Sequence, residues 1–175
     1  MAIKSILSIP DKRLKTKATP IEAVDDGLRR LMDDMMDTMK LGDQGIGLAA
    51  NQIGILSRVL TIDIGPEYNK EPLFMANPEI IFRSTDFQVT SEGCLSVPEQ
   101  YADVERPMSV KVHFLDRYNK AQELEAWGLL AACIQHEVDH LNGVLFIEHL
   151  PPVRRKIVTG KALKAAKRLN PAIKL

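Results

Sequence analysis

The clearest periodic pattern in the first half of the chain covers residues 24–40 and predicts an amphipathic helix. Apolar side chains recur there at intervals of three and four residues, as they do along one face of a helix, and aspartates take the opposite face. We interpret the apolar stripe as core packing rather than as a methionine-rich binding surface. The stripe consists of Val24, Leu28, Leu31, Met32, Met35, Met36 and Met39. We expect the helix to end near Gly42.

Short β-rich runs separated by turn signals come after this helix and predict strands. They cover residues 58–64, 73–82, 87–90, 109–115 and 122–127. Pro78 falls inside the second run. Because proline has no backbone N–H to give to a sheet, it indicates an edge strand or a break there.

A second helix is predicted over residues 128–141, with Asn142 and Gly143 as its stop signal. The segment from Pro151 onward is expected to be loop and helix. Strands that lie between helices without a βαβ rhythm indicate the α+β class. We expect one compact domain of short mixed or antiparallel strands around a central helix, 128–141, with helices near both ends. Residues 1–150 would form its catalytic part and 151–175 a tail of the same domain.

The composition limits the class of protein and the cellular compartment that we expect. A chain of 175 residues can bury a core without disulfides. Lysine plus arginine and aspartate plus glutamate both number 23, so net charge points to neither nucleic acid nor membrane. The only cysteines are Cys94 and Cys133, too few for a secreted disulfide scaffold. Residues 1–12 do not resemble a signal peptide, and no run approaches a membrane span. We therefore expect a cytoplasmic protein.

The strongest chemical signal is the sequence HEVDH at residues 136–140. Positions four apart share one face of a helix, so His136 and His140 can bind one metal ion. Glu137 follows the first histidine and could reach a water on that metal. A motif this short also arises by chance on solvated helices, so by itself it leaves both interpretations open.

Two histidines do not complete a catalytic metal site, which usually has three protein ligands. Cys94, in the sequence EGCLS at 92–96, is the candidate for the third. A thiolate suits iron(II), zinc or cobalt(II), and Gly93 would allow close approach of the backbone. The alternative is that Cys94 is a small buried apolar residue. That alternative fits Cys133 better, one turn before His136, and we expect Cys133 to line the pocket.

Three motifs in this order closely resemble the signature motifs of peptide deformylases: GIGLAANQ at 45–52, EGCLS at 92–96 and QHEVDH at 135–140. The resemblance extends over about residues 3–150. It implies an enzyme that removes the formyl group from the N-terminal methionine of new polypeptides. It also implies one divalent metal per chain, Fe²⁺ with Zn²⁺, Ni²⁺ or Co²⁺ as substitutes, held by Cys94, His136 and His140.

The same resemblance implies roles for the residues around the metal. Glu137 would act as the acid and base, and the Gln52 side chain with the Leu95 backbone N–H would stabilise the oxyanion. The substrate-binding residues would be Ile46, Gly47, Thr90, Glu92, Gly93, Leu129, Ala132 and Cys133. Glu92 is further expected to orient its loop, paired with Arg106.

Two positions depart from the common family pattern. Asn51 stands where proline or threonine is frequent, and Tyr101 where many bacterial members have an arginine that holds the peptide backbone. Both departures leave the metal ligands and oxyanion donors intact.

Other functions compete with this one. A zincin-type peptidase would take its third ligand downstream, but Glu148 and His149 do not fit the extended zincin spacing. A closed structural metal site would need a fourth ligand such as His113, which we expect at the surface. A metal-free binding protein is the remaining alternative.

The C-terminal tail is strongly basic and contains no acidic residue. Its basic residues are Arg154, Arg155, Lys156, Lys161, Lys164, Lys167, Arg168 and Lys174. It looks like the basic C-terminal helix with which some bacterial deformylases approach the nascent-chain exit of the ribosome. A solvated helix end is the alternative. We expect a monomer whose partners are N-formylmethionyl peptides and nascent chains, with possible ribosome contact through this tail.

Overall fold

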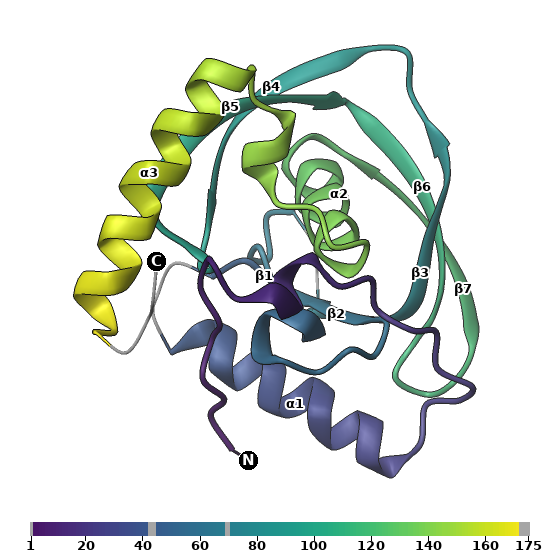
Figure 1. Cartoon of the computed structure of the whole chain (residues 1–175). Helices are drawn as coiled ribbons and strands as arrows, with labels where there is room; N and C mark the ends of the chain where they lie inside the picture. Colours follow the sequence, from purple (N-terminus) through teal and green to yellow (C-terminus); the bar gives the residue numbers. More distant parts are fainter. Residues whose placement is uncertain (1, 42–44, 69–70, 172–175) are drawn as a thin grey trace.

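The computed structural model describes residues 2–41, 45–68 and 71–171, which form three α-helices, seven strands and three 3₁₀ turns (Figure 1). The helices are α1 (Asp26–Lys40), α2 (Gly128–Leu141) and α3 (Pro152–Leu169). The 3₁₀ turns are Lys12–Lys15, Ala50–Ile53 and Phe146–His149. The strands are β1 (Gly47–Ala49), β2 (Val59–Ile62), β3 (Leu73–Arg83), β4 (Phe87–Cys94), β5 (Val97–Pro107), β6 (Ser109–Leu115) and β7 (Ala121–Trp127).

The strands form two antiparallel sheets that enclose α2. One sheet has the order β1-β2-β3-β6-β7, and the other is the hairpin of β4 and β5. In Figure 1, α2 lies inside the curve of these strands, and it contacts both sheets. Most of its side chains are buried, including both histidines. The α+β class with a central 128–141 helix is therefore confirmed.

Helix α1 packs its methionine stripe against β1 and β2. Met32, Met35 and Met39 are fully buried, which confirms that the stripe belongs to the core. Asp25 caps the helix by accepting a hydrogen bond from the Leu28 backbone N–H at 2.8 Å. The expected end near Gly42 lies outside the described residues, and Lys40 is the last helical residue.

The irregularity at Pro78 is present, but the strand is not at an edge. Strand β3 lies between β2 and β6. Its pairing with β2 ends at Ala76, and its register with β6 shifts between Ala76 and Glu79. Pro78 therefore sits where the partner strand has ended and the ladder is already interrupted, so its missing N–H breaks no regular pairing.

Strand β5 was not predicted, and β4 extends beyond the predicted end at residue 90. Strand β4 continues to Cys94, and β5 returns antiparallel from Val97. Gly93 and Pro98 have low strand propensity, and Arg106 is a buried charge in a strand whose other buried residues are Val97, Ala102 and Val104. These residues obscured the alternating pattern. The consequence for the site is that the 92–96 motif forms the tip of a hairpin.

Helix α3 starts directly after Pro151 and packs against β5. Its contact face is small and apolar, made by Ala162, Ala165 and Ala166. The segment from Pro151 was expected to be loop and helix, and the helix takes up most of its described length. Within residues 2–41, 45–68 and 71–171, no helix has both the length and the apolar character to cross a membrane.

The turn after α2 requires a glycine for two separate reasons. Gly143 has φ of 77°, and a Cβ added there would lie 2.5 Å from the Lys15 carbonyl oxygen. Gly65 has a similar φ of 91° but open space around it. Asn142 and Gly143 thus end α2 as the sequence predicted, and the close approach joins α2 to the Lys12–Lys15 turn.

We expect Gly143→Ala to lower the free energy of unfolding by about 2–4 kcal/mol, because left-handed strain and overpacking add. Gly65→Ala should lower the free energy of unfolding by about 1–2 kcal/mol, because only the left-handed backbone strain acts there. Urea denaturation of both variants and the parent measures the difference. Equal losses in the two variants would show that contact with Lys15 does not constrain this turn.

Candidate metal centre and active site

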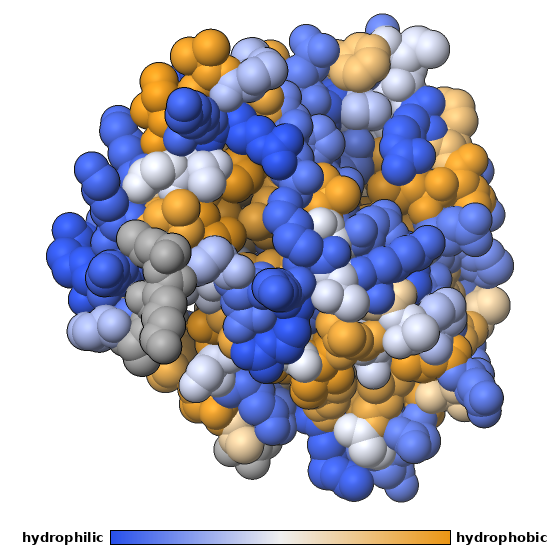
Figure 2. All heavy atoms as spheres, viewed as in Figure 1, coloured by the Kyte–Doolittle hydropathy of each residue, from blue (hydrophilic) through white to orange (hydrophobic). Residues whose placement is uncertain are grey.

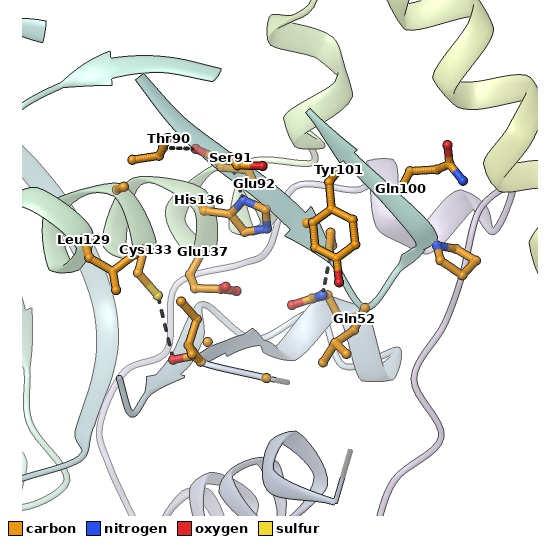
Figure 3. A pocket seen from close by; sticks show the side chains of 18 of the residues that line it. Gln52, Thr90, Ser91, Glu92, Gln100, Tyr101, Leu129, Cys133, His136 and Glu137 are labelled. Atoms are coloured by element: carbon orange, nitrogen blue, oxygen red, sulfur yellow. Dashed lines mark hydrogen bonds and ion pairs between the residues drawn. The ribbon is translucent and has the colours of Figure 1, made fainter. Parts of the chain in front are cut away.

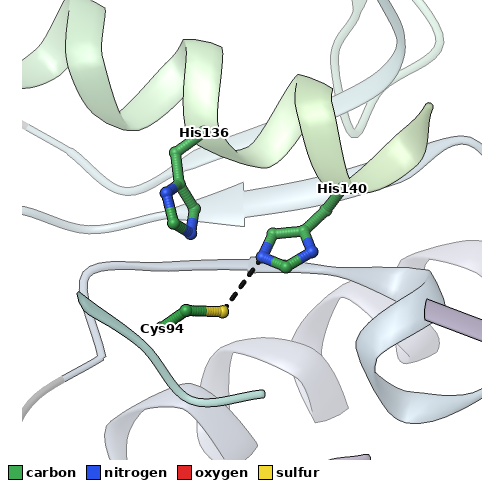
Figure 4. A group of neighbouring side chains, drawn as sticks. All are labelled: Cys94, His136 and His140. Atoms are coloured by element: carbon green, nitrogen blue, oxygen red, sulfur yellow. Dashed lines mark hydrogen bonds between the residues drawn. The ribbon is translucent and has the colours of Figure 1, made fainter. Parts of the chain in front are cut away.

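Helix α2 brings two histidines to one point, where a cysteine from the β4–β5 hairpin meets them (Figure 4). His136 and His140 project from successive turns with ring centroids 5.0 Å apart. The Sγ of Cys94 lies 3.1 Å from Nε2 of His140. One donor atom from each residue lies within 4.8 Å of the others, which is close enough to share one ion. The three residues that the sequence singled out as ligands are therefore together.

The chemistry of this group fits a divalent metal. Burial raises the pKa of the Cys94 thiol, but the charge of His140 and hydrogen bonds from both imidazoles outweigh it and hold that pKa well below its usual value. The thiolate is the form that binds metals. A soft sulfur with two imidazoles is a donor set suited to iron(II), zinc, nickel or cobalt.

Glu137 projects from the same helix into the space beside this group (Figure 3). Its side chain is buried, and within the described part of the chain Oε2 has no hydrogen-bond partner. Burial raises the pKa of this carboxyl, and the charges of His136 and His140 only partly oppose the rise. A Cβ on Gly47 would collide with the carboxylate, so the glycine makes room for it. Among the described residues, Glu137 thus presents a carboxylate oxygen without a hydrogen-bond partner at the site.

Gln52 is held so that its amide nitrogen points toward the cysteine. Its Oε1 accepts the Ala49 backbone N–H at 2.8 Å, which fixes which end of the amide carries the donors. Nε2 then faces Ser96 Oγ at 3.2 Å and Cys94 Sγ at 3.6 Å. Gln52 therefore presents N–H groups to the pocket, and Leu95, the residue after the cysteine, lines the same wall.

Glu92 links the hairpin to the first histidine. Its Oε2 lies 2.8 Å from Nδ1 of His136, and Arg106 binds the same carboxylate through Nε and Nη2. Burial alone would raise the pKa of Glu92, but the bonds from His136 and Arg106 lower it to about 2. A carboxylate on the second nitrogen of a metal-binding imidazole fixes the tautomer and orientation of the ring. The expected Glu92–Arg106 pair is present.

These groups surround one cavity of about 420 Å³. Every candidate catalytic and substrate-binding residue lines it, together with the candidate ligands Cys94 and His136, and the third candidate ligand, His140, lies next to these two. Its wall contains Ile46, Gly47, Gln52, Thr90, Glu92, Gly93, Leu95, Leu129, Ala132, Cys133 and Glu137. Burial and nearby Glu137 hold the pKa of the Cys133 thiol well above its usual value, and its Sγ faces the Ile46 carbonyl at 3.8 Å. Cys133 therefore lines the pocket, as expected.

Part of the pocket wall escaped the sequence analysis. Pro98, Glu99 and Gln100 line the cavity from the start of β5, a strand that was not predicted. Tyr101 pairs across the hairpin with Gly93, and its ring covers that glycine so closely that a Cβ there would collide with it. The departure from arginine at this position thus places an aromatic ring at the mouth of the pocket (Figure 3).

The residues that competing functions would use lie elsewhere. His113 is exposed on β6, as expected. His149 faces Asp139, and Glu148 accepts from the Leu145 backbone N–H and pairs with Lys15. Among the residues described, the candidate metal-ligand group contains only Cys94, His136 and His140. The upstream cysteine, not a downstream residue, is therefore the third member.

Known proteins match both the sequence and the fold. The family model for polypeptide deformylase matches residues 3–156. Peptide deformylases of Rhizobium meliloti and Phenylobacterium zucineum are 48% and 50% identical over 168 residues; each match covers 95% of this chain, and 96% and 99% of the relative.

Solved structures agree. A peptide deformylase from Legionella pneumophila superposes with a TM-score of 0.89 at 44% identity, covering 99% of this chain and 100% of that one. A peptide deformylase from Ehrlichia chaffeensis in complex with actinonin superposes with a TM-score of 0.88 at 38% sequence identity. That match covers 94% of this chain and 98% of the other. The chain belongs to the polypeptide deformylase family.

Proposed function

We propose that the chain removes the formyl group from N-formylmethionine at the start of new polypeptides by a hydrolysis in which Glu137 moves the protons. The family gives the reaction, and its enzymes depend on a metal. The observation that carries the assignment of roles is the carboxylate oxygen of Glu137, which lines the cavity beside the group of Cys94, His136 and His140 and has no hydrogen-bond partner among the described residues.

Cys94, His136 and His140 would hold one divalent ion and leave one position open, as catalytic sites with three protein ligands do. We propose Fe²⁺ as the ion, replaceable by Zn²⁺, Ni²⁺ or Co²⁺. A bound ion would lower the pKa of a water toward about 7 and polarise the formyl carbonyl. Glu92 would hold the His136 ring in place through its 2.8 Å contact with Nδ1.

Glu137 acts first as a base and then as an acid. Its carboxylate accepts a proton from the attacking water and delivers it to the amine that leaves with the methionine. The elevated pKa that burial gives this carboxyl supports the second step, because a more basic carboxylate keeps the proton until the amine takes it.

Gln52 and Leu95 stabilise the charge that develops on the formyl oxygen. The Gln52 amide is already oriented by Ala49, so it loses little freedom when it donates. Donors that are fixed before the reaction begins contribute most to transition-state stabilisation. The backbone N–H of Leu95 at the hairpin tip is the second donor.

The methionine side chain occupies the apolar part of the cavity. Ile46, Leu129, Ala132 and Cys133 give it a narrow wall of apolar or weakly polar atoms. Gly47 and Thr90 lie on the same wall, and Gly93 lets the backbone of the hairpin approach. An unbranched thioether fits such a slot better than a charged or branched side chain does.

We also propose that the enzyme is a monomer in the cytoplasm. The ligands, the proton carrier and the pocket wall all come from one chain. The reducing cytoplasm would keep Cys94 available as a thiolate, whereas oxidation would remove its metal-binding form.

Helix α3 is proposed to contact the ribosome through its exposed basic side chains. The alanine face turns toward β5, so lysines and arginines project outward. Figure 2 shows hydrophilic side chains along the left margin, where Figure 1 places the lower half of α3. Arg155 and Arg168 pair with Glu148 and Glu99, which leaves chiefly lysines for rRNA phosphates. Lys174 lies outside the described residues.

Glu137→Gln should keep the metal and lose deformylation by a factor of about 10²–10⁴, because the ligands remain while the proton carrier is gone. Formate release from an N-formylmethionyl peptide, measured at matched metal content, tests this. A rate near that of the parent would remove Glu137 from the mechanism.

Cys94→Ser should weaken metal binding strongly, whereas Cys133→Ser should retain one metal per chain. Both thiols belong to the same pocket, but only Cys94 lies with the histidines. Metal analysis of the purified variants after dialysis makes the comparison. Full occupancy in Cys94→Ser would refute the ligand assignment.

Reversing three exposed charges on α3, with Lys161, Lys164 and Lys167 changed to Glu, should abolish salt-sensitive binding to ribosomes and leave small-peptide activity unchanged. The matched control changes Lys12, Lys17 and Lys120 to Glu, three exposed lysines elsewhere. Co-sedimentation across a salt series measures binding. If both triple variants bind as the parent does, α3 is only a solvated surface helix.

A further inference from the structure

A continuous path of polar side-chain contacts leads from the protein surface to His136, the first of the two histidines proposed to bind metal. His149 Nε2 lies 2.8 Å from Oδ2 of Asp139, and the same oxygen accepts Nη1 of Arg106 at 2.8 Å. Arg106 continues to Glu92, which contacts Nδ1 of His136. Each member therefore orients the next through a direct polar contact.

Exposure falls steeply along this path. The side chains of His149 and Asp139 are 37% and 23% exposed, whereas those of Arg106 and Glu92 are 4% and 8% exposed. Asp139 is thus the least enclosed acidic member, and one of its oxygens serves both Arg106 and His149. If His149 did not contact it, the Asp139 carboxylate could turn toward water. The buried Arg106 would then lose Asp139 as a hydrogen-bond partner.

The turn that carries His149 also contacts His136 directly. It spans Phe146–His149, and the ring of Phe146 stacks on that of His136 with centroids 6.1 Å apart and planes 24° apart. Phe146 is almost fully buried, so this end of the turn is fixed in the core. The two ends of one short turn therefore reach the same imidazole, one by packing and one through three charged side chains.

We propose that His149 is a positioning residue for the metal centre, which holds Asp139 in place so that Arg106 and Glu92 keep the His136 ring aligned. The inference rests on the proposed metal site. Partners of a metal-binding imidazole typically contribute 10–100-fold to metal affinity. Because His149 acts through intermediates, we expect a smaller effect, about three- to tenfold.

The test compares loss of the donor with its replacement. His149→Leu removes the hydrogen bond to Asp139, and His149→Gln restores an N–H at similar reach. His113→Leu, at an exposed histidine on β6, is the control. Nickel-loaded protein is challenged with a chelator, and we expect metal loss to quicken about three- to tenfold in His149→Leu only. Cobalt-loaded His149→Leu should also show altered visible absorption bands, which report ligand geometry.

A double-variant cycle tests the route of the effect. In an Asp139→Ala background, His149→Leu should cause no further change in metal retention, because the intermediate has gone. Additive effects of the two changes would overturn the route through Asp139. If Asp139→Ala does not fold, the comparison of His149→Leu with His149→Gln decides the proposal by itself.

Unchanged metal retention and cobalt spectrum in His149→Leu would overturn the inference while leaving the proposed function intact. Equal impairment in His149→Gln would also overturn it, because the donor would then not matter. A parental chain that holds no metal would overturn the metal centre and this inference together, so the two failures are distinguishable.

Discussion

Burying the ionisable face of α2 is the constraint on which the rest of this structure depends. His136, Glu137 and His140 lie in an interior where an unpaired charge is strongly unfavourable. The helix can remain there only if other elements bring opposite charges and donors to it. The β4–β5 hairpin does so with Glu92, Cys94 and Arg106, and in the described part of the chain one oxygen of Glu137 is left without a partner. The hairpin thus supplies partners for the buried groups that are proposed to hold a metal, and it leaves unpaired the carboxylate oxygen that is proposed to move a proton.

The same requirement explains why the hairpin, the 45–52 segment and α2 meet with so little space between them. Gly47 lies against the Glu137 carboxylate, and Gly93 lies under the ring of Tyr101. Side chains at either position would push apart elements that must touch. Because Cys94 comes from one element and His136 from another, a bound ion would join them and stabilise the folded chain as well as activate water.

The sequence alone predicted which residues meet at the pocket better than it predicted the strands. His136 and His140 could be placed on one face because helical spacing is a local property, and Cys94 was proposed because a thiolate suits the missing ligand. Gln52 and Leu95 could be placed at the pocket only through the family resemblance of their motifs. Strand β5 was missed because Gly93, Pro98 and the buried Arg106 disguise its alternation. The contacts of Asp139 and His149 had no signal in one sequence, since they depend on a turn ten residues away folding back onto the helix. Pro78 indicated an edge strand or a break, and the sequence could not choose the break, because strand order is a tertiary property.

We propose that hydrolysis of the formyl group requires one metal held by Cys94, His136 and His140. The most direct test is a titration of the metal-free chain with Ni²⁺ while formate release from an N-formylmethionyl peptide and bound metal are measured together. We expect no formate without metal, a rate that rises in proportion to bound metal, and a plateau at one ion per chain. Formate release by the metal-free chain, or metal bound at one ion per chain without any release, would contradict it.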